Sequence, residues 1–311
     1  MVLIADSGAT KTDWVVLDTG TGHRQIATQG IHPLFQTEDD MARIVATELL
    51  PALGAGPVDE LHFYGAGCLP HTLPTVERAL RRHLTVTGTV EVCSDLLAAA
   101  RALCGRQPGI ACILGTGSNS CYYDGRSITA HVPPLGFILG DEGSGACLGK
   151  RLVGDALKGL LPAGLKEALL RHLGMTEADI IDRVYRQPLP NRFLASLAPF
   201  LAAHLDVPTL HTLVKDAFTA FLQRNIMQYD YRRYPVHFAG SIAHHFSPIL
   251  HEAAHEAGIT IGTVTPTPLA GLMAYHQAGN SEGYPKPHSE GYPKPNSEGC
   301  PKPNSKGWPN E

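Results

Sequence analysis

The sequence has no cluster of lysine and arginine residues, and its 311 residues carry a net charge of −4 at pH 7. Proteins that bind nucleic acids need a basic surface, so the composition argues against this class. No apolar run is long enough to cross a bilayer, and no signal-peptide pattern precedes the first apolar run. We therefore expect a cytoplasmic protein with no nucleic-acid and no membrane partner.

Two common motifs are also missing. The 7 cysteines are odd in number and contain no C-x-x-C, which favours reduced, mostly buried thiols over disulfides or a zinc site. The phosphate-binding pattern G-x-x-x-x-G-K-[ST] does not occur, because Ser144 stands five residues before Gly149 and Arg151 follows Lys150. A nucleotide would therefore need a different kind of loop.

What the sequence does contain is typical of an α/β protein. Hydrophobic residues make up 43% of the chain, which is long enough for one large or two ordinary domains. Short apolar runs at 2–5, 14–17, 58–64, 90–93, 109–114, 236–239 and 260–264 predict strands, with helical segments between them. Residues 162–229 are expected to be helical throughout and to serve as scaffold.

The first 17 residues, MVLIADSGATKTDWVVL, predict a strand, a tight turn and a returning strand. Backbone N–H groups in such a turn form a concave site for an anion, and Lys11 adds positive charge beside it. Asp6 at the end of the first strand would hold Mg²⁺, directly or through water. The alternative interpretation is an ordinary hairpin with Asp6 in its turn.

A second hairpin repeats this pattern about a hundred residues later. The strand at 109–114 is followed by Gly115-Thr116-Gly117-Ser118-Asn119 and a returning strand at 120–123. One GTGS sequence is a weak signal, but its pairing with the first hairpin is a stronger one. The pair suggests two similar lobes, each of which presents a phosphate-binding turn to a shared cleft.

Three other places are candidates for a functional site, and the first two have two interpretations each. Asp95 follows a strand and begins a helix, where capping by Ser94 and the helix dipole explain it as well as catalysis does. The glycine-dense segment 135–145, which contains Asp141, indicates either a sharp turn or close approach to a ligand. Gly240 and Ser241 begin a helix that would suit an adenine or a ribose.

The chain ends in an eight-residue repeat from Ser281 onward, SEGYPKPH, SEGYPKPN, SEGCPKPN and SKGWPNE. A segment so rich in Pro, Gly and Lys cannot bury a core, so we expect an extended, mostly disordered tail. The interpretation as an extension without function is favoured over that of a proline-rich docking site.

Seven stretches together resemble the BadF/BadG/BcrA/BcrD-type ATPase superfamily and, within it, the N-acetylglucosamine-kinase-like branch. They are IADSGATKTDW, TQGIHPLFQT, FYGAGC, SDLLAAARAL, ILGTGSNSCYYDG, LGFILGDEGSGACLGK and FAGSIAHHF, in this order between Met1 and His276. The resemblance implies the actin/hexokinase/Hsp70-like fold, in which two ribonuclease-H-like lobes hold ATP between them. The expected boundaries are 1–106 plus 266–278 for the N-terminal lobe with the C-terminal helix returning to it, 107–265 for the second lobe with a helical insertion, and 279–311 for the tail.

The same resemblance implies roles for individual residues. Asp6 would serve Mg²⁺, and Asp95 would be the general base and would also grip the sugar. His32 stands near the sugar, where relatives commonly have asparagine, and this departure leaves the choice of sugar open. The remaining assignments are the first phosphate loop (Gly8, Thr10, Lys11), the second (Gly115, Thr116, Gly117), the adenosine site (Gly240, Ser241) and further sugar contacts (Asn119, Gly136, Asp141).

The function that the resemblance implies is ATP-dependent phosphorylation of a small amino sugar such as N-acetylglucosamine, with ATP and Mg²⁺ as cofactors. The partner is then a small-molecule sugar, and the sequence does not decide whether the chain forms a homodimer. One alternative is an ATP-hydrolysing activator of a partner enzyme, like the iron–sulfur activases of the superfamily. Cys112 and Cys121 flank the second turn but look like core residues and not cluster ligands. The other alternative is a catalytically idle sugar or nucleotide sensor.

Overall fold

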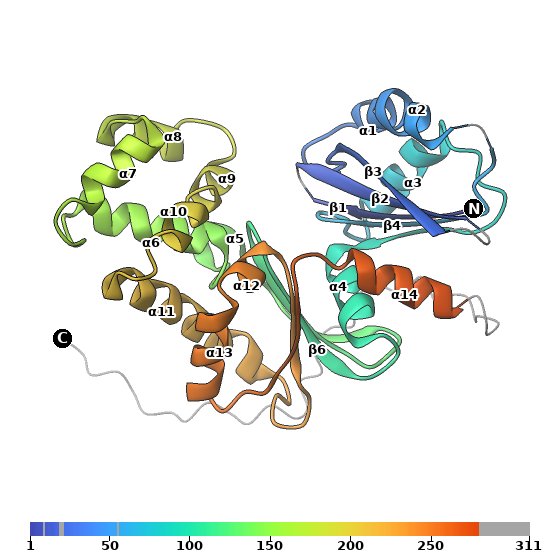
Figure 1. Ribbon diagram of the computed structural model, residues 1–311. Helices are drawn as coiled ribbons and strands as arrows, with labels where there is room; N and C mark the ends of the chain where they lie inside the picture. Colours follow the sequence, from blue (N-terminus) through green and yellow to red (C-terminus); the bar gives the residue numbers. More distant parts are fainter. Residues whose placement is uncertain (9, 19–21, 55, 280–311) are drawn as a thin grey trace.

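Two five-stranded sheets with the same strand order form the framework of the molecule (Figure 1). The computed structural model describes residues 1–279 except 9, 19–21 and 55, so the expected repeat tail lies outside the described residues. The strands of the first sheet are β1 (Val2–Ser7), β2 (Lys11–Asp18), β3 (Gly22–Gln29), β4 (Glu60–Gly65) and β5 (Val90–Ser94), in the order β3-β2-β1-β4-β5.

The second sheet repeats this arrangement with β6 (Gly109–Leu114), β7 (Ser118–Tyr123), β8 (Ile128–Val132), β9 (Val236–Ala239) and β10 (Ile261–Thr265), in the order β10-β9-β6-β7-β8. In each sheet the first three strands pair antiparallel, and the last two run parallel to the first. The two hairpins predicted from the sequence therefore occupy equivalent places in two lobes, as the expected fold class requires.

Helices cover the outer face of each sheet. On the first sheet these are α1 (Glu38–Ile44), a π-helical turn (Val45–Leu49), α2 (Leu50–Leu53) and α3 (Leu73–Arg81). The second lobe has α5 (Gly136–Leu139), α6 (Gly145–Leu157), α7 (Leu165–Leu173), α8 (Glu177–Tyr185), α9 (Pro190–Ala195), α10 (Ala198–Ala202), α11 (Pro208–Arg224), a 3₁₀ turn (Ile226–Gln228), α12 (Ser241–His245) and α13 (Ser247–Glu256). The segment 162–229 is thus helical, as expected, and most of the second core lies among its helices.

Side chains alternate across β1, as they do in any strand. Leu3 and Ala5 are fully buried in the core beneath α1 and α3, whereas Ile4 points to the opposite face, toward the second lobe. Asp6 has the same parity as Ile4. The predicted magnesium ligand therefore lies on the side of the first sheet that faces the other lobe.

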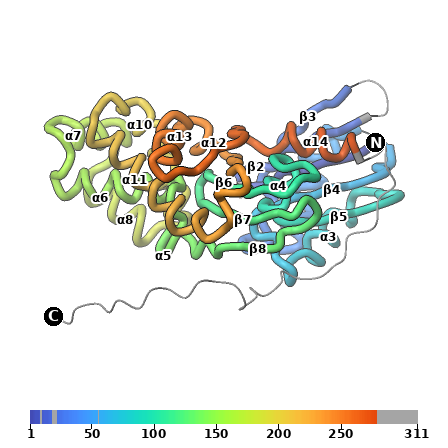
Figure 2. The backbone as a smooth tube through the Cα atoms, turned by 90° about the horizontal axis from the view of Figure 1, so that it is seen from below, coloured from blue at the N-terminus to red at the C-terminus, as the bar shows by residue number. Residues whose placement is uncertain are grey.

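Two helices fill the space between the sheets, and each packs on the sheet of the other lobe. Helix α4 (Asp95–Cys104) follows β5 of the first sheet, yet its Leu96 and Ala100 pack against β6 and β7 of the second. Helix α14 (Leu269–Gly279) follows β10 of the second sheet, yet its Leu269 and Leu272 pack against β1 and β2 of the first. The two helices lie side by side in Figures 1 and 2.

The closest contact between these helices depends on one glycine. A Cβ atom at Gly271 of α14 would lie 2.3 Å from the carbonyl oxygen of Ala102 in α4. This distance is far below van der Waals contact, so any side chain at this position would push the two helices apart.

Two further expectations from the sequence concern the cysteines and membrane-spanning helices. The six cysteines of the described residues are free thiols, and Cys68, Cys112 and Cys121 are buried, as expected. Among the helices of that same part of the chain, none combines the length and apolarity needed to cross a membrane.

We predict that Gly271→Ala lowers the free energy of unfolding by about 1–3 kcal/mol, the usual cost of overpacking a well-packed contact. Gly154→Ala is the matched control, because this glycine also lies inside a helix and a Cβ there meets nothing within 4 Å. The control should instead gain up to ~1 kcal/mol from helix propensity. Denaturant unfolding of both variants checks this, and equal effects of the two would contradict it.

Candidate functional site

Asp6 lies near the carboxyl end of β1, directly opposite Asp13 of β2. Its side chain is partly buried. Burial raises the pKa of the Asp6 carboxyl to about 7, and repulsion from Asp95 and Asp13 adds to the effect. A partly buried carboxylate among other carboxylates is unfavourable without a cation, and sites of this kind often have a function.

Asp95 is the first residue of α4, where the chain leaves β5. Ser94 caps the helix, because its hydroxyl oxygen accepts from the N–H of Leu97 at 3.3 Å. Burial raises the pKa of the Asp95 carboxyl as well. Between the ends of β1 and β5 lies the end of β4, where Gly65 has no side chain. The fold therefore brings Asp6 and Asp95 to one edge of the sheet, close enough for the charge of Asp95 to raise the pKa of Asp6.

The first predicted phosphate loop is the turn between β1 and β2. The N–H of Gly8 donates to the carbonyl of Lys11 at 2.9 Å, which closes the turn, and Thr10 is exposed. The ammonium group of Lys11 pairs with Asp13 at 2.6 Å. The positive charge expected at this turn is therefore bound to the carboxylate that faces Asp6.

The second predicted loop joins β6 to β7 and is held by the start of α6. The N–H groups of Gly145 and Ala146 donate to the carbonyls of Gly115 and Thr116 at 2.8 and 3.1 Å. Asp141 accepts from the N–H of Ser118 at 3.2 Å, and its backbone has a positive φ of 54°, which is uncommon for a residue other than glycine. The glycine-dense segment around Asp141 thus folds back onto the second turn.

Gly240 brings the end of β9 against the same turn. Its φ is 124°, and a Cβ atom would lie 2.2 Å from the carbonyl oxygen of Leu114, the residue before Gly115. Only glycine fits this close approach. Ser241 follows as the exposed first residue of α12. The candidate adenosine residues therefore lie beside the second phosphate turn.

A groove between the lobes contains His32. It is lined on one side by Thr10, Gln29, Gly30, His32, Phe35 and Gln36 of the first lobe, and on the other by Leu189 and Arg192 of the second. His32 is buried, and its pKa is lowered first by burial and further by the charge of Arg192. The sequence did not mark Arg192, because it lies in a helical segment without a motif.

Two predicted sugar contacts, Asn119 and Gly136, are not among the residues that line the groove around His32. The side-chain oxygen of Asn119 accepts from the N–H of Ser120 at 3.0 Å and lies 2.9 Å from Nε2 of His131. Gly136 begins α5 with a φ of 73°. The roles of both residues stay predictions, as do the domain boundaries given above.

Duplicated sheets, two glycine turns and a carboxylate pair at one sheet edge define a two-lobed protein of the actin/hexokinase-like fold. Solved structures of other proteins have the same fold. A protein of Porphyromonas gingivalis, named provisionally as an N-acetylglucosamine kinase, is 48% identical over 90% of this chain and 100% of its own, with a TM-score of 0.88. The chain therefore belongs to the same family as that protein.

Two more distant structures share the fold. A protein of Chromobacterium violaceum with the same provisional name is 21% identical over 88% of this chain and 98% of its own, with a TM-score of 0.71. A ROK-family glucokinase of Streptomyces griseus, solved with glucose and AMPPNP, is 16% identical over 90% and 100%, with a TM-score of 0.53. No protein-family model and no curated protein matches the chain, so membership of the wider superfamily stays a prediction.

The raised pKa of Asp6 predicts an unusual dependence of stability on pH. Between about pH 4, where the unfolded carboxyl ionises, and about pH 7, the folded state holds one more proton than the unfolded state. Stability should therefore fall as the pH rises through this window. In magnesium-free buffer, Asp6→Asn should abolish a slope of up to ~1.4 kcal/mol per pH unit.

Urea unfolding of the wild type and of Asp6→Asn at pH 4 and pH 8 measures this difference. We expect similar stabilities at pH 4 and a more stable variant at pH 8. A variant that is less stable at both values would instead indicate that Asp6 serves to close the turn.

Proposed function

We propose that the chain is an ATP-dependent kinase that transfers a phosphoryl group to a small amino sugar such as N-acetylglucosamine. The observation that carries the proposal is the meeting of Asp6 and Asp95 at one sheet edge, in a chain 48% identical to a protein that bears this provisional name. Phosphoryl transfer needs mainly positioning and charge stabilisation, which two loops and nearby carboxylates can supply.

The carboxylates of the first lobe fit a magnesium ion. Asp6 and Asp13 face each other across β1 and β2, and carboxylate oxygens are the protein ligands that Mg²⁺ prefers. A cation here would also offset the repulsion from Asp95 and Asp13 that adds to the effect of burial on the pKa of Asp6. When bound, Mg²⁺ neutralises charge on the phosphates, and we assign Asp6 to hold it, with Asp13 beside it.

In this proposal the nucleotide phosphates lie between the two turns. Gly8, Thr10 and Lys11 face them from the first lobe, and Gly115, Thr116 and Gly117 face them from the second. Gly240 and Ser241 contact the adenosine.

Asp95 is the proposed base. A positioned carboxylate orients the acceptor hydroxyl and takes its proton, and a pKa raised by burial makes it a better acceptor of that proton once it is ionised. The sugar lies in the groove that contains His32, and Asn119, Gly136 and Asp141 are the further contacts that we propose. Thr10 links this groove to the first phosphate turn.

No specific observation favours the alternatives. An iron–sulfur activator needs cysteines that can reach a cluster, but Cys112 and Cys121 are fully buried in the second lobe. A sensor without activity would not need a base at the end of β5.

The proposal predicts sugar-dependent consumption of ATP. In a panel of free sugars we expect N-acetylglucosamine or a close amino sugar to give the highest kcat/KM, because the family relationship points to this class. A coupled assay for ADP provides the measurement. Hydrolysis that is independent of every sugar, or nucleotide binding without turnover, would reject the kinase in favour of an activator or a sensor.

A second prediction isolates Asp95. Asp95→Asn keeps the size of the side chain and should lower kcat by roughly 10²–10⁴-fold at saturating sugar, the usual contribution of a positioned base. Affinity for ATP should be unchanged, because Asp95 faces the acceptor. The control is Asp39→Asn, which alters an exposed aspartate in the first turn of α1 and should leave kcat unchanged. Full activity of a folded Asp95→Asn protein would refute the assignment.

A further inference from the structure

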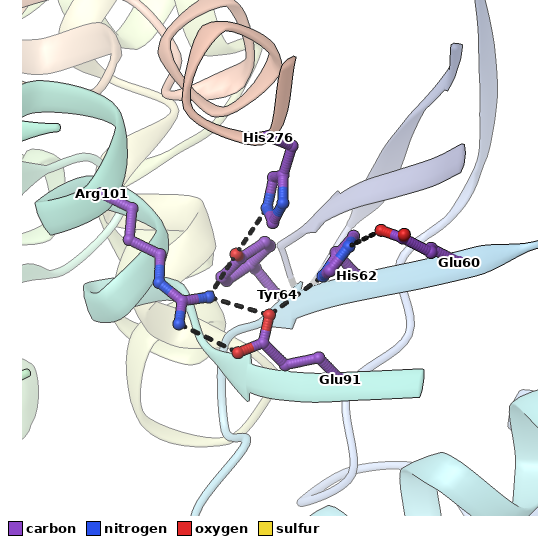
Figure 3. A network of polar contacts seen from close by, with 6 residues as sticks. All are labelled: Glu60, His62, Tyr64, Glu91, Arg101 and His276. Atoms are coloured by element: carbon purple, nitrogen blue, oxygen red, sulfur yellow. Dashed lines mark hydrogen bonds and ion pairs between the residues drawn. The ribbon is translucent and has the colours of Figure 1, made fainter. Parts of the chain in front are cut away.

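A buried polar cluster lies between the first sheet and the two central helices (Figure 3). Arg101 of α4 donates from its two terminal nitrogens to the two carboxylate oxygens of Glu91 in β5, each at 2.9 Å. The side chains of Arg101 and Glu91 are only 8% and 12% exposed. This two-pronged geometry is the most specific and among the strongest that an ion pair can adopt.

The cluster continues from α4 to α14 through Tyr64 of β4. Arg101 donates to the hydroxyl of Tyr64 at 2.6 Å, and that hydroxyl lies 2.9 Å from Nε2 of His276 in α14. Burial lowers the pKa of His276 to about 3, so its ring is neutral, and Nε2 and the tyrosine hydroxyl share a hydrogen bond. One hydroxyl therefore joins both central helices to the first sheet.

The same place has the residue types of a metal site. Ligand atoms of His62, Glu91 and His276 lie within 4.8 Å of one another. However, Arg101 occupies both oxygens of Glu91, and Nδ1 of His62 already lies 3.0 Å from one of them. A divalent ion here would meet the guanidinium at short range, so the cation of this cluster is Arg101 itself.

The stretch of α4 between Asp95 and Arg101 is mostly alanine, and the alanines at positions 98–100 are fully buried. Apolar packing of Leu96 and Ala100 against the second sheet holds this stretch. The polar contacts that fix α4 relative to the first sheet are made by Arg101, six residues after Asp95 and about 9 Å along the axis.

We propose that Arg101 is a positioning residue for Asp95, which it holds in place through its two-pronged pair with Glu91. This inference rests on the proposed function, in which Asp95 is the base. Without the pair, α4 can shift or turn between the sheets, and Asp95 moves with it. A displacement of about 1 Å at a reacting group can cost roughly 10²-fold in rate.

The experiment compares Arg101→Met, Glu91→Gln and the double variant. Glu91→Gln leaves the buried guanidinium without its carboxylate, and Arg101→Met leaves the buried carboxylate with His62 alone. Both should therefore unfold at a lower Tm, whereas the double variant should regain much of this loss. We expect kcat to fall about 10- to 100-fold in all three, with the KM for ATP unchanged. Recovery of Tm without recovery of kcat separates positioning from stability.

A double-mutant test shows whether Arg101 acts through Asp95. Arg101→Met should lower kcat in the wild-type background but not in the Asp95→Asn background, because the base is already absent there. Lys215→Met is the control, since it breaks ion pairs to Glu252 and Glu256 that lie far from α4 in the chain. It should leave kcat unchanged.

Hydrogen exchange of the peptide over residues 95–104 adds a readout that does not depend on activity. Amides in the first turn of α4 should exchange faster in the double variant than in the wild type. Each protein is measured at the same number of degrees below its own Tm. The inference is overturned if exchange is unchanged, or if kcat returns together with Tm. A wild type that is inactive on every sugar overturns the proposed function and this inference with it. An active wild type whose Arg101 variants have unchanged kcat overturns this inference alone.

Discussion

The packing of the alanine-rich helix α4 between the two sheets is the contact on which the joining of the two lobes depends. Helix α4 contacts the first sheet through Ala98 and the second through Leu96 and Ala100. The space between the sheets at this point is set by alanine methyl groups, and larger side chains would force the lobes apart because protein interiors are close-packed. Helix α14 can then lie against α4 only because Gly271 has no side chain.

This arrangement links the lobes to the chemistry. The proposed base, Asp95, is at the start of the same helix that both sheets contact. Helix α4 follows a strand of the first sheet and packs on the second, and α14 follows a strand of the second sheet and packs on the first. The inner face of each sheet is therefore covered in part by a helix that follows the other sheet in the chain.

The duplicated topology explains both the likeness of the two turns and the difference between them. Each turn follows the first strand of its sheet, but Asp6 lies opposite Asp13 in the first lobe, whereas Ile113 lies opposite Asn119 in the second. The pair of facing carboxylates on the hairpin strands is therefore found in the first lobe, whereas the acidic group beside the second turn, Asp141, comes from the segment before α6. Glu91 on the same sheet shows the opposite electrostatic behaviour, because the Arg101 guanidinium and His62 hold its pKa well below the usual range, despite burial. The pKa of Asp6 is raised first by burial, and its carboxylate neighbours Asp95 and Asp13 add to this effect, whereas Glu91 has cationic neighbours that offset it.

The sequence by itself determined the features that depend on neighbouring residues. Apolar runs marked the buried strands, small residues marked both turns, and Ser94 marked the start of α4, because burial, turn geometry and capping are local. The strands β3 and β8 carried no such mark: each lies at a sheet edge and exposes most of its side chains, so its sequence lacks an apolar pattern. The tertiary structure alone decided which helix packs on which sheet and which charges meet. Tyr64 and His276 are 212 positions apart, and no local pattern can predict a contact that exists only because two sheets enclose the same pair of helices.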